Sequence, residues 1–204
     1  MKILSLNQFF EKLKISPIDL SKLDKVNGLT YVCHPKTKEE LQKIIEERIK
    51  KEGTNCDLND IDVSEINDMS KLFQNSKFNG DISKWDVSNV TNMHHMFLNS
   101  LFNNDISEWD VSNVKDMHGM FFYSDFNHDI SKWDVSNVVD MSDMFSCSVF
   151  DNDISNWKVS DKANLKNMFF DSPLENNHNL PKWYKQEPPI WHSTWHKNIP
   201  VKAT

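Results

Sequence analysis

The chain has 204 residues, 38% of them hydrophobic, and its mean hydropathy of -0.61 argues against a membrane span. Its formal charge of -7, from 23 basic and 30 acidic residues, argues against a binder of the nucleic-acid backbone, because such a surface needs clustered lysine and arginine. The three cysteines lack the spacing of a zinc site or a disulfide framework and favour a reducing compartment.

Residues 1–56 are predicted to form a helical N-terminal cap. Their strongest helix is expected from Lys38 to about Lys51, because Thr37 opens a capping box in front of it. Two shorter helices are expected nearer the N-terminus, beginning at Ser5 and at Ser16. The first residues include too few apolar side chains for the core of a signal peptide, so we expect a cytoplasmic protein.

The middle of the chain, residues 57–174, is predicted to be a tandem array of five repeats with a period of 24 residues. The copies align as DISKWDVSNV from Asp81, DISEWDVSNV from Asp105, DISKWDVSNV from Asp129 and DISNWKVSDK from Asp153, after the degenerate DLNDIDVSEI from Asp57. Large apolar residues recur with the same period, as in the column Phe73, Phe97, Phe121, Phe145 and Phe169. One repeat buries too little apolar surface to offset the entropy of ordering its backbone, so the copies are expected to stack.

Within one repeat the spacing of apolar residues changes character. Trp85 and Val87 alternate with a period of two, which is typical of a strand. Met93, Met96 and Phe97 have helical spacing instead. The pattern therefore predicts an α/β repeat solenoid, with a short parallel strand and a short helical turn in each 24-residue coil.

Residues 175–204 form a C-terminal segment rich in proline and tryptophan, which is expected to be extended. Trp183, Trp191 and Trp195 either cover the last repeat or stay exposed as a partner-binding segment. Covering is favoured, because an exposed aromatic cluster lowers solubility. A histidine pair in this segment has helical spacing, but the nearby prolines argue against the helix that would let both bind one metal.

The repeat consensus FNxDISxWDVSNVxxMxxMF resembles that of the BspA-like leucine-rich-repeat proteins, in particular the Mycoplasma-type lipoprotein repeat, over about residues 56–171. This repeat is common in bacterial surface proteins and in phage or prophage genomes. The resemblance implies a leucine-rich-repeat-like solenoid, with roles in adhesion and protein-protein interaction and no catalytic residues. The sequence differs from that of the surface proteins because it shows no secretion signal and no lipid-anchoring cysteine near its start.

Aspartates recur in columns that follow the repeat. The first column comprises Asp57, Asp81, Asp105, Asp129 and Asp153. It either caps turns or binds calcium, and turn capping is favoured because the corners contain almost no glycine. The second column is expected to point outward, because it lies between strand residues; its central members are Asp86, Asp110 and Asp134. Lys84, Glu108 and Lys132 are expected on the same face. We interpret these last six residues as the candidate binding surface, with a merely solvated face as the alternative.

No other group of residues predicts chemistry. His94 and His95 are expected to face solvent rather than to take part in catalysis. The sequence has no glycine-rich phosphate loop, nucleophile elbow or paired-cysteine motif. We therefore expect no enzyme activity, no metal and no cofactor.

Charge is divided unevenly along the chain. Residues 57–171 carry 20 acidic and 8 basic side chains, a net charge of -12, which leaves +5 for the flanking segments. The leading hypothesis is therefore a protein-interaction module that presents an acidic face to a protein partner with a basic surface, with no nucleic-acid or membrane partner. One alternative is an inhibitor of the phage or prophage type that imitates nucleic acid and acts on a host enzyme. A second alternative is a surface adhesin without its secretion signal.

Overall fold

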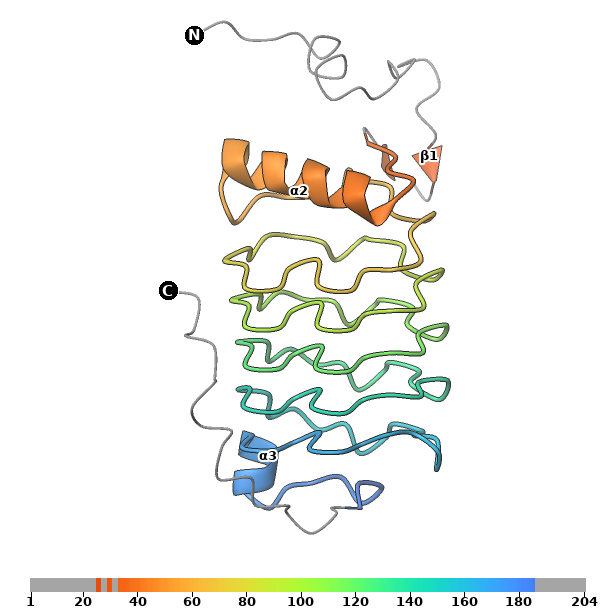
Figure 1. The fold of residues 1–204 in the computed structure, drawn as a ribbon, viewed down its shortest axis with the longest axis vertical. Helices are drawn as coiled ribbons and strands as arrows, with labels where there is room; N and C mark the ends of the chain where they lie inside the picture. The colour runs from red at the N-terminus through yellow and green to blue at the C-terminus, as the bar shows by residue number, and fades with distance from the viewer. Residues whose placement is uncertain (1–24, 27–28, 31–32, 186–204) are drawn as a thin grey trace, which may run out of the picture.

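The computed structural model describes residues 25–26, 29–30 and 33–185. The chain there forms a stack of coils, in which each 24-residue repeat makes one circuit and lies against the next (Figure 1). The two short strands β1 (Lys25–Val26) and β2 (Leu29–Thr30) pair antiparallel, with Lys25 opposite Thr30. Helix α2 (Lys38–Glu52) lies over one end of the stack and helix α3 (Pro173–Asn176) lies at the other. The helices predicted at Ser5 and Ser16 fall outside the described residues.

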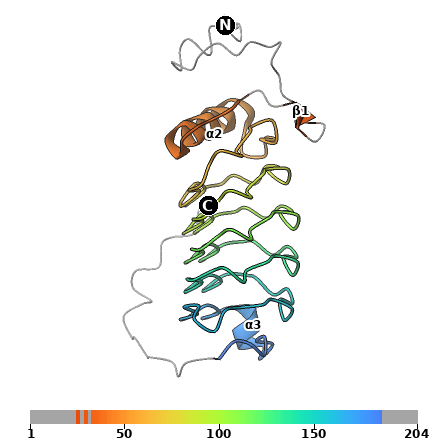
Figure 2. The same ribbon diagram turned by 90° about the vertical axis from the view of Figure 1, so that its right-hand side faces the viewer.

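The predicted cap helix is confirmed. Thr37 Oγ1 accepts a hydrogen bond from the N–H of Glu40 at 3.2 Å, and the N–H of Gly53 donates to the carbonyl of Ile49 at 2.9 Å. Gly53 has a φ of 92°, which suits glycine and ends the helix. Figure 2 shows α2 lying across the first coil. Three of its apolar side chains are buried, namely Leu41, Ile44 and Ile45. No helix among the described residues has the length and apolar character needed to cross a membrane.

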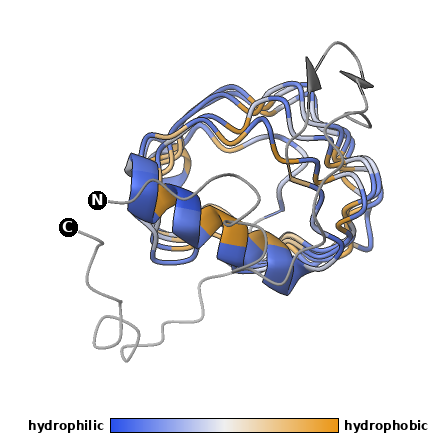
Figure 3. Ribbon diagram, turned by 90° about the horizontal axis from the view of Figure 1, so that it is seen from above, coloured by the Kyte–Doolittle hydropathy of each residue, from blue (hydrophilic) through white to orange (hydrophobic). Residues whose placement is uncertain are grey.

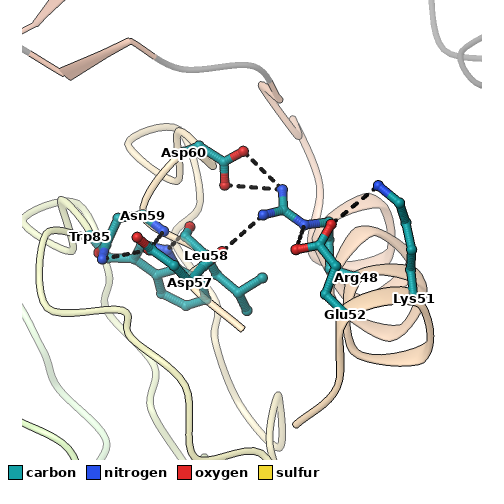
Figure 4. Close-up of polar contacts among 8 residues, drawn as sticks. All are labelled: Arg48, Lys51, Glu52, Asp57, Leu58, Asn59, Asp60 and Trp85. Atoms are coloured by element: carbon teal, nitrogen blue, oxygen red, sulfur yellow. Dashed lines mark hydrogen bonds and ion pairs between the residues drawn. The ribbon is translucent and has the colours of Figure 1, made fainter. Parts of the chain in front are cut away.

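Arg48 joins α2 to the first coil (Figure 4). Its Nη1 donates to both carboxylate oxygens of Asp60, at 3.0 and 2.8 Å, and its Nη2 donates to the carbonyl of Asp57 at 2.9 Å. Its Nε donates to Glu52, one turn later on the same helix, at 3.2 Å. These charge-assisted bonds fix the rotation of the helix over the coil, because a planar guanidinium can make all of them in one orientation only.

The predicted fold class is wrong: the coils are not those of an α/β solenoid of the leucine-rich-repeat type. Between residues 53 and 172 the described chain contains turns and irregular backbone, with neither a strand nor an α-helix. Neighbouring coils share parallel bridges at single positions only, along the column Asp68, Asn92, Asp116, Asp140 and Asn164. Seen from above, the coil backbones nonetheless lie almost in register (Figure 3).

The segment predicted to be helical is a run of overlapping turns, which we call the turn ribbon; it comprises residues 69–76 and their equivalents in later coils. Alternate N–H groups donate to carbonyls of the next coil at 2.8 to 2.9 Å, namely those of Met69, Lys71, Phe73 and Asn75. The N–H groups between them donate to the carbonyl three residues earlier, at 3.1 to 3.3 Å, namely those of Leu72, Gln74 and Ser76. Lys71 and Asn75 have positive φ, of 61° and 57°, which an α-helix excludes.

The segment predicted to be a strand gives its backbone N–H groups to local partners. The N–H of Trp85 donates to the carbonyl of Ile82 at 3.2 Å, and the N–H of Ser88 donates to Asp86 Oδ1 at 3.1 Å. A β-ladder needs these groups to pair with a neighbouring strand. Side chains make the connection instead, because the indole N–H of Trp85 donates to the carbonyl of Leu58 in the preceding coil at 2.9 Å.

The apolar columns form the core of the stack. The rings of Phe73, Phe97, Phe121, Phe145 and Phe169 are fully buried and follow one another at centroid distances of 5.5 to 5.8 Å. Trp183 continues the tryptophan column beyond the last repeat, because its ring stacks on Trp157 at 6.3 Å and its indole N–H donates to the carbonyl of Ile154 at 3.1 Å. Trp191 and Trp195 lie outside the described residues. Each coil thus buries its side chains against the coils on either side, as stacked repeats require.

Candidate functional site

The carboxylates of Asp86, Asp110 and Asp134, which we call the acidic edge, are exposed and occupy the same place in three successive coils. In each, Oδ1 accepts a hydrogen bond from the backbone N–H of the serine two residues later, at 3.1, 3.0 and 3.0 Å. This Asx turn holds the side chain at one orientation. The three charges therefore have a fixed register on the surface.

Turn capping also explains the first aspartate column. Asp81, Asp105, Asp129 and Asp153 each accept from the N–H of the serine two residues later, at 2.8 to 2.9 Å. The backbone N–H of the following serine, and then its hydroxyl, lower the pKa of Asp105 and of Asp129. The preferred interpretation of this column, turn capping, agrees with the geometry, and both columns are built from the same Asp-x-Ser turn.

In the second column, the turn lowers the pKa of Asp134. The hydroxyl and the backbone N–H of Ser136 lower the pKa of Asp134, and Lys158 in the next coil acts in the same direction. Lys158 takes the place of the aspartate in the last copy of the column, so the acidic edge ends there. The edge therefore presents three exposed aspartates, one in each of three successive coils.

Lys84, Glu108 and Lys132 are exposed, as the sequence predicts. Lys132 Nζ donates to Glu108 Oε1 in the preceding coil at 3.0 Å, and this contact raises the pKa of Lys132. The two charges offset each other. Lys84 offsets one of the three aspartates, so the six residues of the candidate surface carry a net charge of -2.

The structure also brings together three histidines, which we call the histidine cluster: His94, His95 and His118. Each is half-buried, so His94 and His95 face solvent with only part of their side chains. The 24-residue period puts His118 in the column of His94, one coil further on. The period could have predicted this cluster, because residues one period apart in the sequence are neighbours in adjacent coils.

The sequence comparisons identify the repeats. The family described as Mycoplasma protein of unknown function, DUF285, matches residues 40–146 and 99–183. The chain belongs to this family. The two matches overlap and together run from within α2 to the end of the stack, so the DUF285 sequence pattern covers the cap helix as well as the coils. Searches of curated proteins and of solved structures found no match to this DUF285 protein.

Proposed function

We propose that this DUF285 protein is a non-enzymatic interaction module whose acidic edge binds a protein partner with a basic surface. The observation that carries the proposal is the repeated Asp-x-Ser turn, which presents Asp86, Asp110 and Asp134 at one place in successive coils. Fixed charges lose little side-chain entropy on binding, and their summed field steers a partner of opposite charge. The net charge of -12 over residues 57–171 acts in the same direction.

The aspartate-to-asparagine triple variant D86N/D110N/D134N tests the proposal. Asparagine Oδ1 accepts the same backbone hydrogen bond, so the turn is kept while the charge is lost. The matched control is D81N/D105N/D129N, which removes the same number of charges from the first column. Each purified protein is immobilised and its captured partners from the native host are compared by mass spectrometry, then by affinity at low and high salt.

A partner that the wild type and the control capture, and that the D86N/D110N/D134N variant loses, supports the acidic edge as the binding surface. Its affinity is expected to fall with rising salt, because screening weakens the attraction between exposed charges. Equal capture by all three proteins, with the fold intact by circular dichroism, contradicts the proposal.

A second candidate function is inhibition of a host enzyme by imitation of nucleic acid. It is favoured by the two parallel series of exposed carboxylates, which repeat once per coil as phosphates repeat along a strand. Competition between the protein and duplex DNA for the captured partner distinguishes this function from binding to a basic surface that does not bind DNA.

The relationship to the BspA-like proteins is a further proposal, supported by the recurring WDVSNV motif. It extends to sequence pattern and to a role in adhesion, and does not include the leucine-rich-repeat architecture. Binding of the purified protein to the surface of host cells is the measurement that tests this role.

A further inference from the structure

The histidine cluster has the composition of a transition-metal site. One donor nitrogen from each of His94, His95 and His118 can be chosen so that all three lie within 4.8 Å of one another. The rings of His94 and His95 are 3.9 Å apart between centroids, and the ring of His118 is 5.0 Å from the first and 4.8 Å from the second. A tetrahedral zinc ion needs about 3.4 Å between nitrogens, given Zn–N bonds of about 2.0 to 2.1 Å. Binding of zinc therefore requires these side chains to rotate so that the three nitrogens come closer together than 4.8 Å.

Gly119 makes the space in which the ring of His95 lies. A Cβ at this position would be 2.3 Å from His95 Cδ2 and 2.6 Å from its Nε2. Positive φ alone does not call for glycine here, because the equivalent residues Lys71, Asp143 and Asn167 have positive φ with side chains. The absence of a side chain at Gly119 therefore allows His95 to lean across the next coil toward His118.

The surroundings of His94 and His95 favour neutral imidazoles, which are the form that binds metal. Burial, followed by the charges of His94 and His118 and of Lys71, lowers the pKa of His95 to about 4. Burial also lowers the pKa of His94, against the opposing effect of the carboxylates of Asp116 and Asp140. These two carboxylates would partly balance the charge of a bound dication.

The ring of His118 is oriented by a contact with a second residue. His118 Nδ1 lies 2.7 Å from Ser142 Oγ in the next coil, which fixes the orientation of the ring and leaves Nε2 for a metal. Histidine ligands in metalloproteins are commonly oriented by such a hydrogen bond to the other ring nitrogen. The cluster thus combines three imidazole donors, a space made for one of them and a contact that orients another.

We propose that His94, His95 and His118 bind a divalent transition metal of the zinc class, with one nitrogen from each ring. Imidazole is a preferred donor for zinc, copper and nickel, whereas magnesium and calcium prefer oxygen. Three histidines leave the fourth tetrahedral position open to water or to a side chain of another molecule. The site is independent of the acidic edge and does not rest on the interaction proposed above.

Titration of the chelator-treated full chain with zinc chloride by isothermal calorimetry tests the site. The wild type is expected to bind one ion in the histidine cluster. His95→Asn is expected to weaken binding at least about 100-fold, because it removes a ligand while asparagine still tolerates the positive φ. His178→Asn is the matched control, since His178 also has positive φ and lies at the end of α3. A second control, H192N/H196N, removes the histidine pair of the C-terminal segment.

Both controls are expected to keep the wild-type affinity for the ion at the cluster. Gly119→Ala is expected to weaken zinc binding although it removes no ligand, because its Cβ displaces His95. Visible absorption of the cobalt-loaded protein reports the tetrahedral geometry independently of affinity, and circular dichroism checks the fold. If His95→Asn does not fold, His118→Asn takes its place as the variant that lacks one ligand. Zinc binding that is absent in the wild type, or unchanged in folded His95→Asn or His118→Asn, overturns the proposal.

Discussion

The indole N–H of Trp109 donates a hydrogen bond to the carbonyl of Ile82, 27 residues earlier and in the preceding coil, at 3.1 Å. The same bond recurs for Trp85, Trp133 and Trp157, and each of these indoles is buried. On this side of the stack, neighbouring coils are therefore connected by hydrogen bonds from side chains, whereas the strands of a sheet are connected by backbone hydrogen bonds. The tryptophans provide both ring stacking and a directed polar contact between coils.

Trp109→Phe is expected to lower the free energy of unfolding by about 0.5–1.5 kcal/mol, because the carbonyl of Ile82 loses the indole donor and keeps only the N–H of Trp85. Loss of ring volume adds to this cost. Urea denaturation followed by circular dichroism measures the change. Trp183→Phe is the control, since Trp183 is half-buried at the end of the stack and a smaller loss is expected there. Equal losses at the two positions would contradict the inferred role of burial.

Asp110→Ala is expected to lower the free energy of unfolding by about 0.5–1 kcal/mol, because the N–H of Ser112 loses its acceptor. Asp110→Asn is expected to be nearly neutral, since it keeps that acceptor and removes only the charge. Thermal denaturation of the two variants measures the difference. If Asp110→Asn is as destabilising as Asp110→Ala, the carboxylate charge rather than the Asx turn stabilises the corner.

Arg48→Lys is expected to lower the free energy of unfolding by about 1–2 kcal/mol, because lysine cannot bind Asp60 and the carbonyl of Asp57 at once. The control is Lys51→Ala, which removes an exposed contact to Glu52 and is expected to cost less than about 0.5 kcal/mol. A double-mutant cycle of Arg48→Lys with Asp60→Asn isolates the pair. No coupling between these two substitutions would show that the pair does not hold the cap.

Stability is expected to fall as the pH drops from about 6.5 toward 4, because His95 has a pKa of about 4 in the folded protein against 6.5 for an ordinary histidine. In that range the unfolded chain binds a proton that the folded chain excludes, so acid favours unfolding. Aspartates whose pKa is lowered act in the same direction, but below their ordinary value of 3.8.

His95→Asn is therefore expected to flatten the dependence of the unfolding free energy on pH over this range. Denaturant titrations at several pH values, in the presence of a chelator, measure the slope. His178→Asn serves as the control and is expected to keep the wild-type slope. An unchanged slope in His95→Asn would show that other groups cause the acid sensitivity.

Much of the arrangement could be predicted from the period. The column that begins at Phe73 is buried throughout its length, and α2 begins after its capping residue Thr37. The exposure of Asp86, Asp110 and Asp134 could be predicted in the same way, although the reason given for it, alternation along a strand, is wrong. These features depend on side-chain type and spacing, which can be read directly from a repeat.

The helical spacing of Met93, Met96 and Phe97 led to a wrong prediction, because that spacing identifies residues that are buried together and not the backbone that carries them. In the turn ribbon His95 has positive φ, and its N–H donates to the carbonyl of His118 in the next coil at 2.9 Å. A carbonyl so distant in the sequence replaces the local acceptor of an α-helix only when the packed rings bring the coils close together.

The sequence by itself determined the 24-residue period, the side chains that are buried and the start of the cap helix. The tertiary structure alone decided where each backbone N–H finds its acceptor and how deeply His94, His95 and His118 are buried. The physical reason is that apolar burial follows from residue type, whereas hydrogen-bond partners and desolvation depend on the distance between coils. That distance is set by the stacking of the phenylalanine and tryptophan columns over the whole array.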